Sequence, residues 1–545
     1  MKALRAVFTF ITMLLAVATN AQKLVSSFSK ADSLRGDIHS PLRTCYDINF
    51  YHLNVAFDLA QKNISGSNLF KFTATRDFKR LQFDLFANLN IQKVEYHGLQ
   101  LPVERLYDAV FLTFDREIKA GAQDSFRVYY SGKPHEAKNA PWDGGMVFSK
   151  TADNSYWLAT ACQGLGASAW WPNKDQQADE ADSALISINV QKGLTAVSNG
   201  RLVAKKELNN GYTRFDWKVE NPINNYAISA NIAPYTQISD SYNGLNGKLA
   251  LNYYVLPQDV EKAKNQFKQV KQMLEAFEYW FGPYPFYKDG YKIVQTPFLG
   301  MEHQSAVAYG NEFKNGYLGR DLSGTGWGLK WDFIIVHESA HEWFGNNITA
   351  KDIADMWLHE SFTTYAESLF TEYWYGEEAG AAYVIGQRNL VQNDKPIIGT
   401  YGVNSPGSGD MYFKGANLLH TIRQLVNNDE KWRNILRGLN TTFGKKTCTG
   451  TEIIAYLTKE TGLNLVPAFE QYLNYTNIPT LETKNEGGKV WCRWLSDVSN
   501  FEMPIKTSDG KWLFPKTTWT VLADYNNASQ LKIEPNFYIN FKRDP

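Results

Sequence analysis

Residues 336–345, "VHESAHEWFG", contain two histidines four positions apart, with a glutamate directly after the first. The surrounding apolar residues recur at helical spacing: Phe333, Val336, Ala340 and Phe344. This periodicity predicts a helix over about 332–345, which would place His337 and His341 on one face, about 6 Å apart. Two imidazoles at that separation can bind the same zinc ion. The competing interpretation is a helix that carries two histidines without a metal.

A third ligand separates these two interpretations, because a catalytic zinc ion usually takes three protein ligands and keeps one position open. An HExxHxxGxxH pattern would need a histidine at 347 and a glycine at 344, but Asn347 and Phe344 stand there. Nineteen residues after His341, "DMWLHESFTTYAESLF" (residues 355–370) offers Glu360 on a second predicted helix. Seven positions later, Glu367 shares its face and is expected to orient one histidine, unless it is a surface glutamate.

The spacing of HExxH to Glu360 resembles the gluzincin pattern. The segments "VHESAHEWFGNNIT" (336–349) and "DMWLHESFTTYAE" (355–367) further resemble the M1 family of zinc aminopeptidases. The resemblance covers roughly residues 46–480. It implies a thermolysin-like catalytic domain and one zinc ion per chain. It also implies a short form of the family, without its large C-terminal helical domain.

A second segment, "LGMEHQSAVAYG" (residues 299–310), resembles the GxMEN motif of the M1 family and includes Gly300 and Met301. The resemblance implies that Glu302 binds the free α-amino group of a peptide. A charged partner is also reasonable chemically, because an ammonium that enters a closed cleft must offset its desolvation. Leu299 and His303 depart from the family's glycine and asparagine, so His303 is expected to alter the amine pocket and to add a titrating group.

Two further resemblances complete the expected substrate site. The segment "TACQGLGASAWWPNKDQ" (residues 160–176) resembles the M1 region that implies Gln163 as a second amine-binding residue. The segment "DMYFKGANLLH" (residues 410–420) resembles the YxKGA motif, which implies that Tyr412 stabilises the oxyanion. A tyrosine hydroxyl can donate a hydrogen bond to a developing negative charge.

The 545 residues exceed the size of a single hydrophobic core and predict a multidomain α+β protein. Residues 1–21 have the layout of a secretory signal peptide. Period-two alternation predicts an N-terminal antiparallel β domain over 22–243. Helical periodicity from about Val260 predicts a mainly helical domain over 244–482, which the resemblance implies is thermolysin-like. A small C-terminal β domain is expected over 483–545, after the polar joint "LETKNEGGK".

Composition excludes some partners and leaves others open. The 56 basic and 56 acidic residues cancel, which gives no electrostatic argument for nucleic acid. The apolar run near the N-terminus is shorter than a spanning helix, so no stable membrane insertion is expected. The four cysteines form no CxxC pair and are not expected to bind metal; their disulfide pairing and the oligomeric state stay open.

Together these features predict an exported zinc metallo-aminopeptidase, periplasmic or secreted, that acts on peptides with a free N-terminus. His337, His341 and Glu360 would hold zinc, and Glu338 would act as general base and then as general acid. A competing hypothesis is a zinc endopeptidase whose amine anchor is disabled by Leu299 and His303. Epoxide hydrolysis, a second reaction of the M1 family, and noncatalytic peptide binding by the same fold are two further hypotheses.

Overall fold

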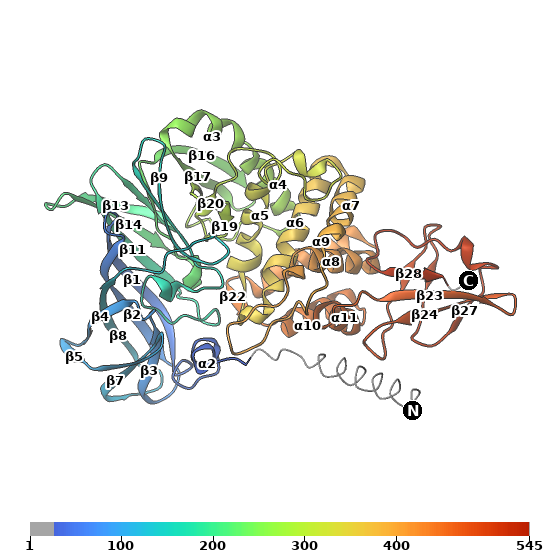
Figure 1. The fold of residues 1–545 in the computed structure, drawn as a ribbon, viewed down its shortest axis with the longest axis horizontal. Helices are drawn as coiled ribbons and strands as arrows, with labels where there is room; N and C mark the ends of the chain where they lie inside the picture. The colour runs from blue at the N-terminus through green and yellow to red at the C-terminus, as the bar shows by residue number, and fades with distance from the viewer. Residues whose placement is uncertain (1–26, 544–545) are drawn as a thin grey trace, which may run out of the picture.

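The computed structural model describes residues 27–543, which form three consecutive units (Figure 1). An N-terminal β unit, drawn in blue to teal, lies beside a central helical unit in green, yellow and orange, and a small β unit follows in red. The predicted signal peptide, residues 1–21, lies outside the described residues, so export stays a prediction. Within residues 27–543, none of the helices combines the length and hydrophobicity that crossing a bilayer requires.

The N-terminal unit is built on an eight-stranded sheet. Its strands, in spatial order, are β13 (Arg201–Glu207), β14 (Tyr212–Val219), β11 (Ser183–Gln191), β1 (Tyr46–Asp58), β2 (Asn63–Ala74), β8 (Gln123–Gly132), β4 (Leu89–Tyr96) and β5 (Leu99–Leu101). All neighbouring pairs are antiparallel except β1 with β11. Along β1 the apolar side chains of Leu53, Val55 and Phe57 are buried, while the residues between them are partly exposed. The predicted period-two alternation therefore corresponds to a sheet with one face in the core.

Two smaller sheets and a short helix complete this unit. The first sheet contains β3 (Phe78–Asp84), β7 (Ala109–Ile118) and β6 (Val103–Leu106); the second contains β12 (Thr195–Val197), β15 (Asn231–Ala233), β10 (Tyr156–Ala161) and β9 (Gly145–Lys150). Helix α2 (Lys30–Gly36) precedes them and begins at a capping box formed by Ser29 and Asp32. Gln163 lies just after β10 and therefore starts the connection from this unit toward the helical unit.

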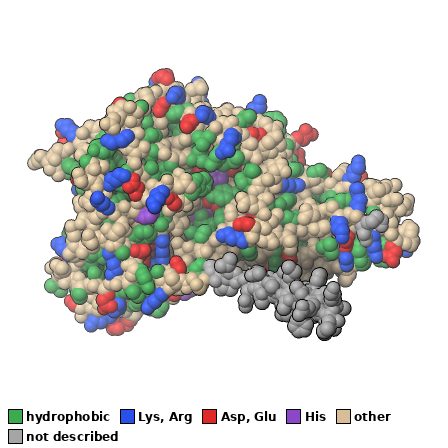
Figure 2. All heavy atoms as spheres, viewed as in Figure 1, with side chains coloured by type: hydrophobic (Ala, Val, Ile, Leu, Met, Phe, Trp, Pro, Cys, Tyr) green, Lys and Arg blue, Asp and Glu red, His purple; other side chains and the backbone are tan. Residues whose placement is uncertain are grey.

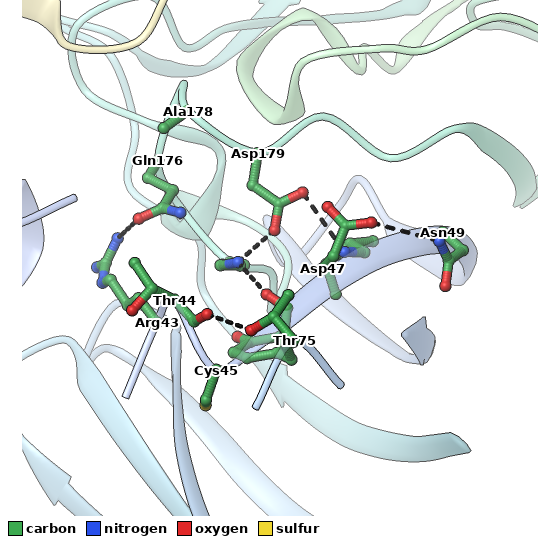
Figure 3. Close-up of polar contacts among 12 residues, drawn as sticks. Arg43, Thr44, Cys45, Asp47, Asn49, Thr75, Gln176, Ala178 and Asp179 are labelled. Atoms are coloured by element: carbon green, nitrogen blue, oxygen red, sulfur yellow. Dashed lines mark hydrogen bonds and ion pairs between the residues drawn. The ribbon is translucent and has the colours of Figure 1, made fainter. Parts of the chain in front are cut away.

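The connection that follows Gln163 is tied to the sheet by buried charged groups (Figure 3). Lys174 Nζ donates to the Tyr46 carbonyl at 2.6 Å and also contacts the Asp179 carboxylate. Arg43 donates to Asp84 at 2.8 Å and to the Asp175 carbonyl at 3.1 Å. These contacts satisfy charges that burial would otherwise make costly. They fix the loop from residue 162 to 179 at its C-terminal end.

The helical unit begins with a five-stranded sheet ordered β16 (Thr236–Gly244), β17 (Gly247–Val255), β18 (Tyr291–Gln295), β20 (Val307–Tyr309) and β19 (Gly300–Met301). Its helices are α3 (Val260–Gln266), α4 (Gln269–Phe281), α5 (Phe333–Ala340), α6 (Trp357–Tyr375), α7 (Glu377–Gly386), α8 (Phe413–Val426), α9 (Asp429–Phe443), α10 (Gly450–Thr461) and α11 (Val466–Asn474). A short parallel pair, β21 (Ile348–Ala350) and β22 (Lys446–Cys448), joins distant parts of it. Strand β16 pairs with β17, so this sheet starts near residue 236 and not after the predicted boundary at 243.

The C-terminal unit is a four-stranded sheet ordered β27 (Thr520–Leu522), β24 (Lys489–Leu495), β23 (Thr480–Glu486) and β28 (Asn540–Arg543), with a small pair β25 (Ile505–Lys506) and β26 (Trp512–Leu513). The polar segment predicted as a joint is a hairpin, because β23 and β24 pair antiparallel across Gly487 and Gly488. Both glycines have positive φ, which allows this tight reversal. Strand β23 therefore already belongs to the C-terminal sheet.

The four cysteines are all buried, and none is bonded to another. Cys45 and Cys162 lie in the N-terminal unit, Cys448 ends β22 and Cys492 lies in β24.

Candidate active site

Helix α5, in the interior of the helical unit, carries His337, and His341 follows directly after its last residue. Every residue of this helix is buried, so its side chains are held by packing on all sides. The Asp332 carboxylate caps the N-terminus by accepting hydrogen bonds from the backbone N–H groups of Ile334 and Ile335. Asp332 is itself held by the Tyr309 hydroxyl at 2.7 Å. The start of the helix is thus fixed relative to strand β20.

The His337 and His341 rings face the same point, with centroids 5.2 Å apart. His341 Nδ1 lies 3.0 Å from the Phe344 carbonyl, which can only accept, so Nδ1 carries the proton and Nε2 keeps its lone pair. The chain leaves the helix at Phe344 and Gly345, whose dihedral angles are not helical, and this departure turns the Phe344 carbonyl toward the ring. Gly345 has φ +133°, and a Cβ there would lie 3.1 Å from His341 Nδ1.

Helix α6 brings Glu360 to these two rings. Glu360 Oε2 lies 3.7 Å from His337 Nε2 and 3.5 Å from His341 Nε2, and it is buried without a hydrogen-bond partner. Bonds of about 2.0–2.1 Å to a tetrahedral ion place ligand atoms about 3.3–3.5 Å apart. The donor set of two imidazole nitrogens and one orphaned carboxylate oxygen therefore fits zinc.

Glu367 lies two helical turns after Glu360 on α6 and contacts His337. Its Oε1 lies 2.7 Å from His337 Nδ1, while its Oε2 accepts from the Tyr383 hydroxyl at 2.8 Å and from Gln387 at 2.9 Å. His341 has a comparable neighbour in the Thr363 hydroxyl at 3.2 Å. No sequence pattern indicated Tyr383, Gln387 or Thr363, because hydroxyls and amides of this kind occur throughout the chain.

Glu338 follows His337 and faces the same cavity. A carboxylate oxygen of Glu338, one of Glu302 and a ring nitrogen of His341 all lie within 4.8 Å of one another. This second cluster shares His341 with the first, but the first has two imidazoles and the unpartnered Glu360 oxygen, which favours it as the metal site. Burial raises the pKa of Glu338 to about 7, and the neighbouring His337 opposes this rise.

Glu302 stands directly after strand β19 and is joined to the N-terminal unit by Gln163. Gln163 Nε2 donates to Glu302 Oε1 at 2.6 Å and to Glu360 Oε1 at 3.0 Å. Burial raises the pKa of the Glu302 carboxyl. Because Gln163 donates through its nitrogen, its amide oxygen can accept another hydrogen bond beside the Glu302 carboxylate.

His303 does not enter the cavity, contrary to the expectation from its position in the motif. The chain turns immediately after Glu302, where the Ala306 N–H donates to the His303 carbonyl at 2.8 Å. The His303 side chain is fully buried and both of its ring nitrogens lack a partner. Burial lowers the pKa of His303 to about 3, so it adds no titrating group near neutral pH.

Tyr412 directly precedes helix α8 and lies against His337. Its ring stacks on His337 with a centroid separation of 6.0 Å and an interplanar angle of 24°. Burial and the carboxylates of Glu360 and Glu302 hold the pKa of Tyr412 well above its usual value, so the hydroxyl keeps its proton. It can therefore donate a hydrogen bond into the cavity.

These groups share one cavity of about 360 Å³ between the N-terminal and helical units. Its polar lining includes Gln163, Glu302, Glu338, Glu360, Glu367, the two histidines and Tyr412; its apolar lining includes Leu299, Gly300, Met301, Leu322, Phe333, Ile334, Leu390 and Phe413. Trp142 and Arg320 complete it from two loops that the sequence did not indicate. The space-filling view shows a recess near the middle of the molecule, bordered by hydrophobic side chains, with histidine visible inside it (Figure 2).

One protein-family model matches the part of the chain that carries most of this site. The peptidase family M1 domain matches residues 265–472, which include both histidines, Glu360, Glu302 and Tyr412. Residues 265–472 of this chain are therefore similar to an M1 peptidase domain. Gln163 lies outside the matched range and reaches this M1 domain from the N-terminal unit.

Two curated relatives are similar over most of this chain. A probable aminopeptidase 2 from Sulfurisphaera tokodaii is 24% identical over 74% of the chain and 51% of the relative. A leucyl aminopeptidase from Saccharolobus solfataricus is 21% identical over 81% of the chain and 55% of the relative. The chain thus spans about half the length of the curated relatives it matches.

A solved structure shows that the fold of the M1 domain and its N-terminal neighbour recurs elsewhere. An M1 zinc metallopeptidase from Deinococcus radiodurans superposes with a TM-score of 0.65 at 20% identity, over 79% of this chain and 94% of that one. The multidomain α+β architecture, with a β-sheet unit preceding a helical one, is therefore shared.

Proposed function

We propose that this chain is a zinc-dependent aminopeptidase that removes N-terminal residues from peptides. The observation that carries the proposal is the juxtaposition of two sites in one cavity. The His337, His341 and Glu360 ligand atoms converge on one point, and the Glu302 carboxylate lies beside them. A metal site alone fits many hydrolases, whereas an anionic group next to it selects substrates with a free amine.

Each residue has a role that its position supports. A zinc ion bound by His337, His341 and Glu360 would polarise the scissile carbonyl and lower the pKa of a bound water. Glu338 is close enough to the same point to take a proton from an attacking water and to deliver it to the leaving amine. A carboxyl whose pKa lies near 7 suits both halves of that transfer. Tyr412 donates to the oxygen on which negative charge develops.

The amine anchor sets which bond is cut. The Glu302 carboxylate and the amide oxygen of Gln163 would both accept hydrogen bonds from the α-ammonium of the substrate. Strand β19, which leads to Glu302, lies at the cavity wall and can pair with an extended peptide backbone. With its amine held at Glu302, a peptide presents its first peptide bond to the metal ligands.

The endopeptidase hypothesis assumed that Leu299 and His303, which depart from the family motif, disable the amine anchor. His303 lies outside the cavity, and Leu299 joins the apolar lining while Glu302 keeps its contact with Gln163. The anchor geometry therefore supports the exopeptidase. Against the noncatalytic hypothesis, the three ligands, Glu338 and Tyr412 all face one cavity. We also propose export to the periplasm or the medium, and the only support for it is the signal-peptide pattern of residues 1–21.

Metal analysis combined with activity tests the proposal. The purified chain is expected to bind one zinc ion and to hydrolyse an aminoacyl fluorogenic amide. A chelator should abolish that hydrolysis, and added zinc should restore it. Stoichiometric zinc without turnover of any peptide would instead favour a noncatalytic binding protein.

Glu367 is proposed to orient His337, and its replacement tests this role. Glu367→Gln is expected to weaken zinc affinity about 10- to 100-fold, because the carboxylate that fixes the ring and raises its basicity is lost. The affinity is measured by competition with a chromogenic chelator. Glu378→Gln, an exposed acid on α7, is the control and should bind zinc like the parent. Equal affinity in both variants would show that Glu367 has no part in zinc binding.

A further inference from the structure

The charges that line the cavity are arranged with opposite signs at its two ends. Four carboxylates gather around His337 and His341, from Glu302, Glu338, Glu360 and Glu367. Among the residues that line the cavity, Arg320 is the one Lys or Arg. A short peptide is a zwitterion, with an ammonium at one end and a carboxylate at the other. Whether Arg320 can reach that carboxylate depends on the direction in which the peptide lies in the cavity.

Strand β19 gives this orientation. Glu302, at its C-terminal end, lies near His341. Two residues earlier, a Cβ on Gly300 would lie 2.8 Å from Glu338 Oε1 and 2.9 Å from Ile334 Cδ1. Moving from Glu302 to Gly300 therefore means moving from the C-terminal end of α5 toward its N-terminal end. A peptide anchored by its amine at Glu302 and extended along β19 runs in this direction.

Arg320 lies beyond the same end of α5. The Phe333 ring, in the first turn of the helix, stacks on His337 at 5.1 Å. The Tyr317 ring packs against Phe333 at 5.3 Å, and the Arg320 guanidinium lies 5.3 Å from the centroid of Tyr317. Two side chains, Phe333 and Tyr317, therefore connect His337 to Arg320 through successive contacts. Since an extended peptide rises about 3.3 Å per residue, two or three residues beyond the scissile bond bring a carboxylate to this region.

The backbone that carries Arg320 is fixed. Tyr317 and Arg320 exchange two backbone hydrogen bonds, at 2.8 and 3.0 Å, across a tight turn. Gly316 N–H donates to the Trp331 carbonyl at 2.7 Å, and the Leu318 N–H donates to the Asn311 side chain at 2.8 Å. The guanidinium is thus presented from a defined position on an otherwise exposed turn.

Within residues 27–543, no carboxylate forms an ion pair with Arg320. The adjacent acid, Asp321, accepts instead from Ser323 and from the Gly326 N–H. The nearby Glu312 pairs with Lys314. Arg320 therefore keeps its hydrogen-bond donors for a ligand, and a planar guanidinium is well suited to a carboxylate.

We infer that Arg320 binds a carboxylate on the leaving part of the peptide, so that short peptides with a free C-terminus, or peptides with an acidic residue there, are favoured substrates. This inference rests on the proposed aminopeptidase function. It adds a specificity-determining residue on the side of His337 opposite Glu302. The two sources of the carboxylate are the C-terminus and an acidic side chain.

Matched tripeptides test the inference. The substrates are Leu-Gly-Gly, its C-terminal amide, and Leu-Gly-Glu amide, and kcat/KM for removal of the first residue is measured for each. The parent chain is expected to prefer a carboxylate-bearing peptide over the plain amide by about fivefold, as for a solvent-exposed charge pair. Preference for Leu-Gly-Gly identifies the C-terminus as the ligand, and preference for Leu-Gly-Glu amide identifies the side chain. The preference should shrink in high salt.

Arg320→Gln is expected to bring the ratio of acid to amide close to one. Lys330→Gln removes an exposed cation that follows the same loop without lining the cavity, and its ratio should equal that of the parent. A ratio unchanged in Arg320→Gln, or a parent that cuts acid and amide equally, overturns the inference while leaving the aminopeptidase in place. A parent that cuts none of the three peptides overturns the proposed function, and the inference with it.

Discussion

Glu338→Gln is expected to bind zinc normally and to lose at least about a hundredfold in kcat, the usual contribution of a general base. Glutamine has the shape of glutamate but does not accept the proton of an attacking water. Glu338 is buried beside His337 without being part of the His337, His341 and Glu360 cluster, so the metal site should survive. The measurement pairs metal analysis with steady-state kinetics on an aminoacyl amide.

Glu342→Gln supplies the matched control. Glu342 is a buried glutamate close to Glu338 in sequence, but it does not line the cavity, and its carboxylate accepts from the Ser305 N–H. Burial raises the pKa of Glu342 to about 8, so the protonated carboxyl already resembles an amide at neutral pH. Near-normal turnover by Glu338→Gln at full zinc occupancy would contradict the assignment of the base.

Glu302→Gln is expected to lower kcat/KM on substrates with a free amine about 10- to 150-fold, the equivalent of about 1.5–3 kcal/mol for a hydrogen bond to a charged group. The Glu302 carboxylate is buried and accepts a hydrogen bond from the Gln163 amide at 2.6 Å. An ammonium bound beside this amide would therefore pair with Glu302. Glutamine removes the charge and keeps the volume.

The loss should be specific to the amine. The same variant is tested on a peptide whose N-terminus is acetylated, for which Glu302 offers no charge pairing. If free and acetylated substrates respond alike to the substitution, Glu302 acts on folding or on the metal site and is no amine anchor. Thermal unfolding of the variant separates these two causes.

The spacing of residues along helices predicted that the side chains of His337, His341 and Glu360 lie together. His337 and His341 lie one turn apart, and Glu360 and Glu367 lie two turns apart, so local periodicity alone puts each pair on one face. The residues that depended on distant parts of the chain, Glu302, Gln163 and Tyr412, were indicated by resemblance only. Periodicity carries no information on which loops meet across a cavity.

Several details depended on backbone and tertiary geometry. The predicted helix to residue 345 ends earlier, because Phe344 and Gly345 adopt the angles that turn a carbonyl to His341. His303 was expected at the amine pocket, but the turn after Glu302 buries it. Arg320 is one of many arginines in the sequence, and only the fold reveals that it stands at the end of the cavity.

The central claim is that a metal site and an amine anchor act on one substrate. The most direct measurement compares hydrolysis of a panel of aminoacyl fluorogenic amides with hydrolysis of their N-acetylated twins by the zinc-loaded chain. We predict that the free amines are cleaved, that the acetylated twins are inert, and that a chelator abolishes the cleavage. Equal cleavage of free and acetylated substrates would contradict the claim and establish an endopeptidase.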